Sequence, residues 1–101
     1  MNIATHWTVP LDHPAFAGHF PGTPILPGVV LLDIALQAIT EASGIPLDRC
    51  EISSVKFLSP VGPGDVLVIQ HEISASGTIR FDILAGPRKI ASGSLVPGSP
   101  E

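Results

Sequence analysis

Charged side chains are scarce in this chain of 101 residues, and basic ones are especially few. Charged residues make up 14% of the sequence, only five residues are Lys or Arg, and the formal net charge is -4. Nucleic-acid binding depends on clustered cations, and here only Arg88 and Lys89 are adjacent. A nucleic-acid partner is therefore not expected.

Paired cysteines and long apolar runs are also missing. Cys50 is the only cysteine, so no disulfide forms within the chain, and the N-terminus shows no charged-then-apolar leader. A cytoplasmic location is therefore expected. The longest nearly apolar stretch, residues 29–39, contains Asp33 and Gln37 and falls short of the roughly 20 residues that a membrane helix needs. It predicts a buried helix instead.

Apolar residues, in contrast, are abundant and make up 45% of the chain. This composition is globular, and the length predicts a single domain over residues 1–101, with 97–101 as a frayed tail. A domain of this size buries only about two thirds of the surface that its unfolded chain exposes. The surplus of apolar side chains therefore predicts a homo-oligomer.

One helix and five strands are expected. Residues 29–42 contain helix formers without a break, and Gly44 followed by Pro46 supplies the stop. Before them, residues 11–28 are rich in proline and glycine and predict a restrained loop. Antiparallel strands, the last four as a meander, are predicted at residues 2–9, 49–58, 65–76, 78–85 and 89–96. Because the helix is apolar almost all round, we expect a curved sheet to cover it, which is an α+β fold.

Two segments carry ordered motifs. Residues 18–28 read G-H-F-P-G-T-P-I-L-P-G and lead into the helix, and residues 56–65 read K-F-L-S-P-V-G-P-G-D. Both resemble the patterns of the bacterial 3-hydroxyacyl-[acyl-carrier-protein] dehydratases of fatty-acid synthesis. The resemblance spans nearly the whole chain. It implies a hot-dog fold, with about five strands wrapped around one central helix, and conversion of a 3-hydroxyacyl thioester to the trans-2-enoyl thioester.

Such an elimination requires a base for the carbon beside the carbonyl, an acid for the departing hydroxyl and a donor for the enolate oxygen. His19 has a side chain that titrates near neutral pH, and the resemblance implies that it takes the carbon-bound proton. A loop histidine that is hydrogen-bonded to backbone is the common case elsewhere. The surrounding motif favours the catalytic role here.

Asp33 lies in an otherwise apolar helical run, where an ionised carboxylate is unfavourable to bury without a partner. Gln37 follows four residues later, so both side chains share a helix face, and the amide is placed to orient the carboxyl group. The resemblance implies that Asp33 delivers a proton to the leaving hydroxyl, directly or through water. The alternative is an aspartate on the one solvent-exposed face of the helix.

Gly28 stands where the helix begins, so its backbone N–H is free to point at an anion, and the missing Cβ admits close approach. The resemblance implies that this N–H binds the thioester carbonyl oxygen. The alternative is a simple helix-entry turn, and both interpretations are compatible. Phe16 and Phe20 flank His19 and either line an acyl tunnel or simply pack.

The remaining aromatic and histidine residues are expected to be structural. Trp7 and Phe57 are expected to fill the core. The other histidines, His6, His13 and His71, show no metal-ligand spacing, so we expect them to be structural or on the surface and expect no metal or other cofactor.

Two departures leave the pathway open. The fatty-acid dehydratases with G-H-F-P-G usually carry Glu where this chain has Asp33, which is the residue of the related dehydratase-isomerases. The sequence also begins without the N-terminal helix and strand of the usual enzymes, and in this it resembles the short dehydratases of aryl-polyene pathways. The acyl chain is therefore not defined by the motifs.

The resemblance also implies partners. The substrate is a thioester of acyl-carrier protein or coenzyme A, and the histidine and acid of one active site come from different subunits of a homodimer. An acyl-carrier protein is acidic, so Arg88 and Lys89 are the first candidates for a basic rim that binds it.

Two other functions remain open. Hot-dog acyl thioesterases also place an acid on the central helix, although they generally lack the G-H-F-P-G loop. The other alternative is a non-catalytic acyl-carrier-binding subunit.

Overall fold

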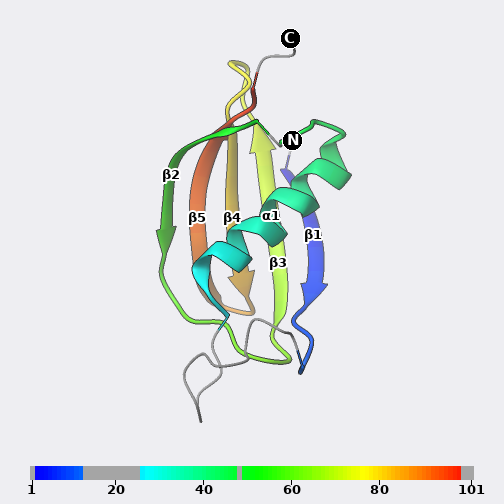
Figure 1. Ribbon diagram of the computed structural model, residues 1–101, viewed down its shortest axis with the longest axis vertical. Coiled ribbons are helices and arrows are strands. Elements are labelled where there is room, and N and C mark those ends of the chain that lie inside the picture. The colour runs from blue at the N-terminus through cyan, green and yellow to red at the C-terminus, as the bar shows by residue number, and fades with distance from the viewer. Residues whose placement is uncertain (1, 13–25, 48, 99–101) are drawn as a thin grey trace.

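A five-stranded antiparallel sheet with one helix lying across it makes up the fold (Figure 1). The computed structural model describes residues 2–12, 26–47 and 49–98. Along the chain the elements are β1 (Asn2–Thr8), α1 (Gly28–Ser43), β2 (Glu51–Phe57), β3 (Val66–Ile73), β4 (Ile79–Ala85) and β5 (Arg88–Val96). The order of strands in the sheet is β1-β3-β4-β5-β2. The expected α+β hot-dog architecture is confirmed.

Helix α1 ends for the reason that the sequence indicates. Gly44 adopts a left-handed conformation with φ 76°, and its N–H donates to the Thr40 carbonyl oxygen at 2.8 Å. A residue without a Cβ adopts this conformation at little cost, and such a glycine closes many helices. The observed helix exceeds the predicted one, residues 29–42, by one residue at each end.

All five predicted strands are present, but the expected four-strand meander is wrong for β2. Strands β3, β4 and β5 are consecutive neighbours, whereas β2 pairs with β5 at the sheet's edge. Composition and alternation mark where strands occur, while their pairing depends on contacts between residues far apart in the chain. The Pro- and Gly-rich turn after β2 carries the chain to the other side of this meander.

The core lies between the sheet and α1. On β4, alternate residues Ile79, Phe81 and Ile83 are buried, and the helix buries Leu31 and Ile39. Alternation is what a sheet covered on one face requires. The opposite face of the sheet carries polar residues, and Lys56, Ser92, Asp82 and Gln70 lie side by side across four strands there.

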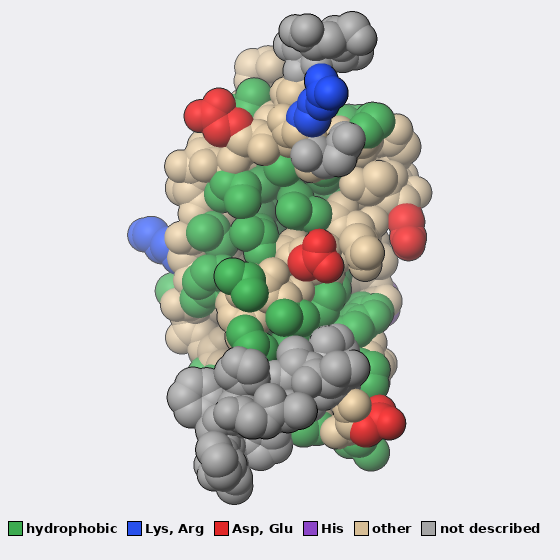
Figure 2. Space-filling model, in the orientation of Figure 1, with side chains coloured by type: hydrophobic (Ala, Val, Ile, Leu, Met, Phe, Trp, Pro, Cys, Tyr) green, Lys and Arg blue, Asp and Glu red, His purple; other side chains and the backbone are tan. Residues whose placement is uncertain are grey.

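The outer side of α1 is uncovered in the single chain. Val29 is 76% exposed, and Asp33 and Gln37 are exposed. Figure 2 shows hydrophobic side chains gathered over the face of the molecule on which α1 lies. The apolar sequence of the helix predicts that it is covered on most sides, but within one chain the sheet covers only one side. Among the described residues, no helix has the length and hydropathy needed to cross a membrane.

Candidate active site

The N-terminus of α1 opens onto a cleft of about 380 Å³. Pro27 precedes the helix in extended conformation, and the first helical hydrogen bonds run from the N–H groups of Val30 and Leu31 to the Pro27 carbonyl oxygen at 3.0 and 3.2 Å. The N–H of Gly28 therefore precedes the first of these bonds. The cleft is mostly apolar, and its lining consists of Leu26, Gly28, Leu31, Phe57, Leu58, Ser59 and Pro60.

Phe57 lies beside Gly28 and does not fill the core, which corrects the expectation for this residue. It is 49% exposed, and a Cβ built on Gly28 would lie 3.0 Å from the Phe57 Cζ atom. Trp7, in contrast, is half-buried and packs against the core as expected. The close approach predicted at Gly28 is thus made, within this chain, by an aromatic ring.

Asp33 and Gln37 lie along a groove of about 530 Å³ between α1 and β1. They share a helix face, as their spacing predicts. Among the described residues no hydrogen bond joins the two side chains, so the amide does not hold the carboxyl group within this chain. Both side chains are exposed. The alternative of a solvent-exposed aspartate therefore describes the single chain.

Two further ionisable residues, His6 and Glu41, line this groove and were not identified as site residues from the sequence. Glu41 continues the stripe of Asp33 and Gln37 by another four residues, a spacing that was available as a signal. His6 reaches the groove from β1, which only the pairing of distant elements reveals. Neither residue forms a hydrogen bond with Asp33 in the described part of the chain.

The two motifs of the sequence meet in space. Leu26, at the end of the first motif, donates its N–H to the carbonyl oxygen of Val61 in the second at 2.8 Å. His19, Phe16 and Phe20 lie outside the described residues, as does His13. The helix start and the turn of the second motif are thus adjacent, and the segment that contains His19 precedes Leu26 directly.

Comparisons with known proteins agree with this architecture. The sequence matches the family of ApeI-like dehydratases over residues 1–94. It is 37% identical to the 3-hydroxyacyl-[acyl-carrier-protein] dehydratase FabZ of Chlamydia trachomatis serovar L2, in an alignment that covers 93% of this chain and 70% of that protein.

Solved structures show the same fold. The dehydratase heterocomplex ApeI:P from Xenorhabdus doucetiae is similar with a TM-score of 0.78 and 23% identity, covering 94% of this chain and 85% of that one. The fluoroacetyl-CoA-specific thioesterase FlK is similar with a TM-score of 0.68 and 17% identity, covering 94% and 88%. The fold therefore serves dehydratases and thioesterases, and the sequence matches decide between them. This chain belongs to the family of ApeI-like dehydratases and is an enzyme of that class.

Proposed function

We propose that the protein removes water from a 3-hydroxyacyl thioester, with His19 as the base and Asp33 as the acid. The observation that carries this proposal is the arrangement on α1. An exposed carboxylate, with no hydrogen-bond partner among the described residues, follows five residues after Gly28. Five residues of helix rise about 7.5 Å. An acyl thioester with its carbonyl oxygen at the helix N-terminus spans a distance of this order to reach the carboxyl group.

Each group has one task in the reaction. His19 takes a proton from the carbon beside the thioester carbonyl, and the Gly28 N–H stabilises the enolate oxygen that forms. Asp33, as the general acid, gives a proton to the 3-hydroxyl, which leaves as water while the double bond forms. Gln37 orients the carboxyl group of Asp33 once substrate is bound, and Phe16 and Phe20 line the acyl site. Proton exchange with solvent then resets both catalytic groups.

The protein acts, we propose, as a homodimer joined along β2. This strand is an edge of the sheet, and its side chains are exposed apart from Val55, although they include Ile52 and Phe57. An unpaired edge with exposed apolar residues readily pairs with another strand. When two copies of β2 pair antiparallel across a twofold axis, the unpaired backbone groups of this edge form hydrogen bonds and the two sheets become one.

Such a dimer allows the histidine of one subunit to serve the Asp33 of its partner. Asp33 lies on the uncovered side of α1 and has no described partner within its own chain. A site shared between subunits supplies the missing groups from outside. The solved relative with the name ApeI:P is a heterocomplex, so a complex with a different subunit is the competing arrangement.

Mixing two inactive variants tests both the residues and the sharing of the site. We expect His19→Ala and Asp33→Asn each to abolish dehydration of a short 3-hydroxyacyl thioester mimic. When the two are unfolded together and refolded as a mixture, half of the dimers are mixed and each mixed dimer has one intact site. Activity should return to roughly a quarter of that of the wild type. Enoyl thioester is measured by chromatography and mass.

Four outcomes contradict parts of the proposal. Full activity in either single variant removes that residue from the mechanism. A mixture as inactive as its components shows that both groups come from one subunit. Release of free acid in place of enoyl thioester identifies a hot-dog thioesterase. If the folded wild-type protein binds acyl-carrier protein but turns over no carrier-bound substrate, the chain is a non-catalytic subunit.

The carrier and pathway belong to the same proposal. We favour a substrate on acyl-carrier protein over coenzyme A because relatives such as FabZ carry acyl-carrier protein in their names. Arg88 and Lys89, at the start of β5, remain the candidates for the basic rim that binds the carrier. An aryl-polyene substrate is supported by the family match to ApeI-like dehydratases, and a cytoplasmic location by the lack of a cysteine pair.

A further inference from the structure

The turn after β2 holds the chain at both ends of the segment that contains His19. On one side, Val9 donates its N–H to the Asp65 carbonyl oxygen at 2.9 Å and accepts a hydrogen bond from Gly64 N–H at 2.9 Å. On the other, Leu26 donates to the Val61 carbonyl oxygen at 2.8 Å. Val9, Leu26 and Val61 are all buried. The turn of residues 60–65 is thus the common anchor of residues 9 and 26.

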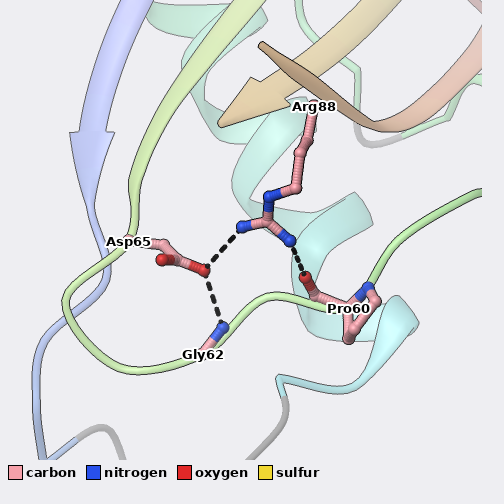
Figure 3. A network of polar contacts seen from close by, with 4 residues as sticks. All are labelled: Pro60, Gly62, Asp65 and Arg88. Carbon is pink, nitrogen blue, oxygen red and sulfur yellow. Dashed lines mark hydrogen bonds and ion pairs between the residues drawn. The ribbon is translucent and has the colours of Figure 1, made fainter. Parts of the chain in front are cut away.

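One carboxylate oxygen closes this turn (Figure 3). Asp65 Oδ2 accepts the Gly62 N–H at 3.0 Å and lies 3.4 Å from Arg88 Nη2, while Arg88 Nη1 donates to the Pro60 carbonyl oxygen at 3.3 Å. The guanidinium group therefore bridges the beginning and the end of the turn. A planar group with several fixed donors holds two acceptors in a defined geometry, which a flexible ammonium group does less well.

The bridge comes from a different part of the sheet. Arg88 opens β5, next to the turn between β4 and β5, so its side chain ties that hairpin to the turn after β2. Leu26, in turn, stands two residues before Gly28, where α1 begins. The hydrogen bond between Leu26 and Val61 therefore links the turn to the chain just before the helix start.

We infer that Asp65 and Arg88 are positioning residues for the dehydration, acting as a clamp on the turn that anchors Val9 and Leu26. This inference rests on the proposed roles of His19 and Gly28. The clamp does not touch substrate. It keeps the two ends of the His19 segment, and the helix N-terminus, at a fixed separation, and errors of about 1 Å at reacting groups reduce turnover by as much as a hundredfold.

A matched ion pair nearby supplies the control. Lys89 Nζ lies 3.4 Å from Asp82 Oδ1, the same separation as in the Arg88–Asp65 pair, and both pairs are partly exposed. Asp82 lies on β4 and, among the described residues, forms no hydrogen bond or ion pair with the turn of residues 60–65. Asp82→Ala therefore removes an equivalent ion pair without releasing the anchor, and Arg80→Met removes a cation elsewhere on the same strand.

The test combines turnover with amide hydrogen exchange on the full chain. For Asp65→Ala and Arg88→Met we expect kcat on a short thioester mimic to fall at least about tenfold, with KM changed by less than about threefold. The amides of Val9 and Leu26 should exchange faster by NMR. Asp65→Asn keeps an acceptor for Gly62 and should retain more activity than Asp65→Ala. Asp82→Ala and Arg80→Met should match the wild type in both measurements.

The short thioester mimic is not attached to acyl-carrier protein, so any role of Arg88 in binding the carrier does not affect the measured kcat. Wild-type kcat in Asp65→Ala, or an equal loss in Asp82→Ala, overturns the inference. A fall in kcat that is proportional to a loss of folded protein, with Val9 and Leu26 still protected in the folded fraction, also overturns it. Failure of the proposed function would give a different pattern. His19→Ala would then keep full activity, while the amides of Val9 and Leu26 would still exchange faster in Asp65→Ala and Arg88→Met.

Discussion

Among single residues, His71 has an unusual environment. It lies on the core face of β3, 2% exposed, between Ile3 and Phe81 on the neighbouring strands. Neither ring nitrogen has a hydrogen-bond partner within the described part of the chain. Burial disfavours the charged imidazolium, so the pKa of His71 is lowered from its ordinary value of 6.5. The sequence placed His71 in a strand without indicating which face it occupies.

This environment predicts that the fold loses stability in mild acid. Below pH 6.5 the unfolded chain binds a proton at His71, whereas the folded chain does not until its lower pKa is reached. The free energy of unfolding therefore falls as the pH drops below 6.5, by at most about 1.4 kcal/mol per pH unit from this residue. Urea unfolding at pH 7.5, 6.5 and 5.5 measures the slope.

The variant His71→Leu isolates this contribution from those of the carboxylates. It should be at least as stable as the wild type at pH 7.5, because a buried polar group without partners is replaced by an apolar one of similar size. Its stability should fall less between pH 6.5 and 5.5. An identical slope in both proteins would show that His71 is already paired or hydrated in solution.

The candidate site was predictable in residue type but not in environment. The position of Asp33 on a helix and its shared face with Gln37 follow from spacing alone, and the structure has both. Their exposure does not follow, since an apolar run predicts burial, and the uncovered side of α1 appears only when one sheet is seen to cover one helix face. The predicted roles of His19, Phe16 and Phe20 stay predictions.

At the scale of elements, the end of β2 limits the space that is open in front of the first residue of α1. The Phe57 ring occupies the space in front of Gly28, with its Cε1 and Cε2 atoms 3.1 Å from where a Cβ would lie. Such a contact requires the ring to move by a few tenths of an ångström, and a half-exposed ring is able to move. The absence of a Cβ at this position therefore leaves room either for the Phe57 ring or for the substrate.

A double-variant comparison separates these two needs. We expect Gly28→Ala to fold with a melting temperature within about 4 °C of the wild type, because alanine favours a helix by up to about 1 kcal/mol and offsets the contact. Its kcat should fall at least about tenfold, because the methyl group crowds the backbone N–H that we propose as the oxyanion donor. Adding Phe57→Leu should not restore kcat. Recovery of wild-type turnover in the double variant would assign Gly28 to ring packing alone.

The elements themselves were largely readable from the sequence. Gly44 and Pro46 mark the end of α1, and the turns at residues 76–77 and 86–87 mark the hairpins of β3 to β5. The place of β2 was not readable, because its partner β5 lies more than thirty residues further along the chain. A strand that follows a helix has no short turn to fix its neighbour.

For the molecule as a whole, the apolar surface and the free edge lie together. The start of α1 and the end of the exposed strand β2 adjoin each other at the cleft lined by Gly28 and Phe57. The abundance of apolar residues predicted an oligomer because a single small domain cannot bury them all. The proposed twofold contact along β2 would cover this region and leave β1, at the opposite edge of the sheet, for solvent or another partner.

Two isoleucines of matched exposure test this arrangement. Ile52 on β2 is 42% exposed and Ile73 on β3 is 39% exposed. Ile52→Lys places two charges in a twofold interface, so we expect the dissociation constant to rise at least about a hundredfold. Light scattering coupled to size-exclusion chromatography should show a monomer with a native circular dichroism spectrum, whereas Ile73→Lys should remain a dimer.

If the active site is shared between subunits, only the variant that remains a dimer should be active. Folded, monomeric Ile52→Lys should be inactive on the thioester mimic, and raising its concentration until dimers form should restore turnover by mass action. Ile73→Lys should match the wild type at every concentration. An active monomer would place His19 and Asp33 in one subunit. A wild-type chain that is itself monomeric and inactive would instead require a different partner subunit at the β2 edge, since one subunit then lacks the groups that complete the proposed site around Asp33.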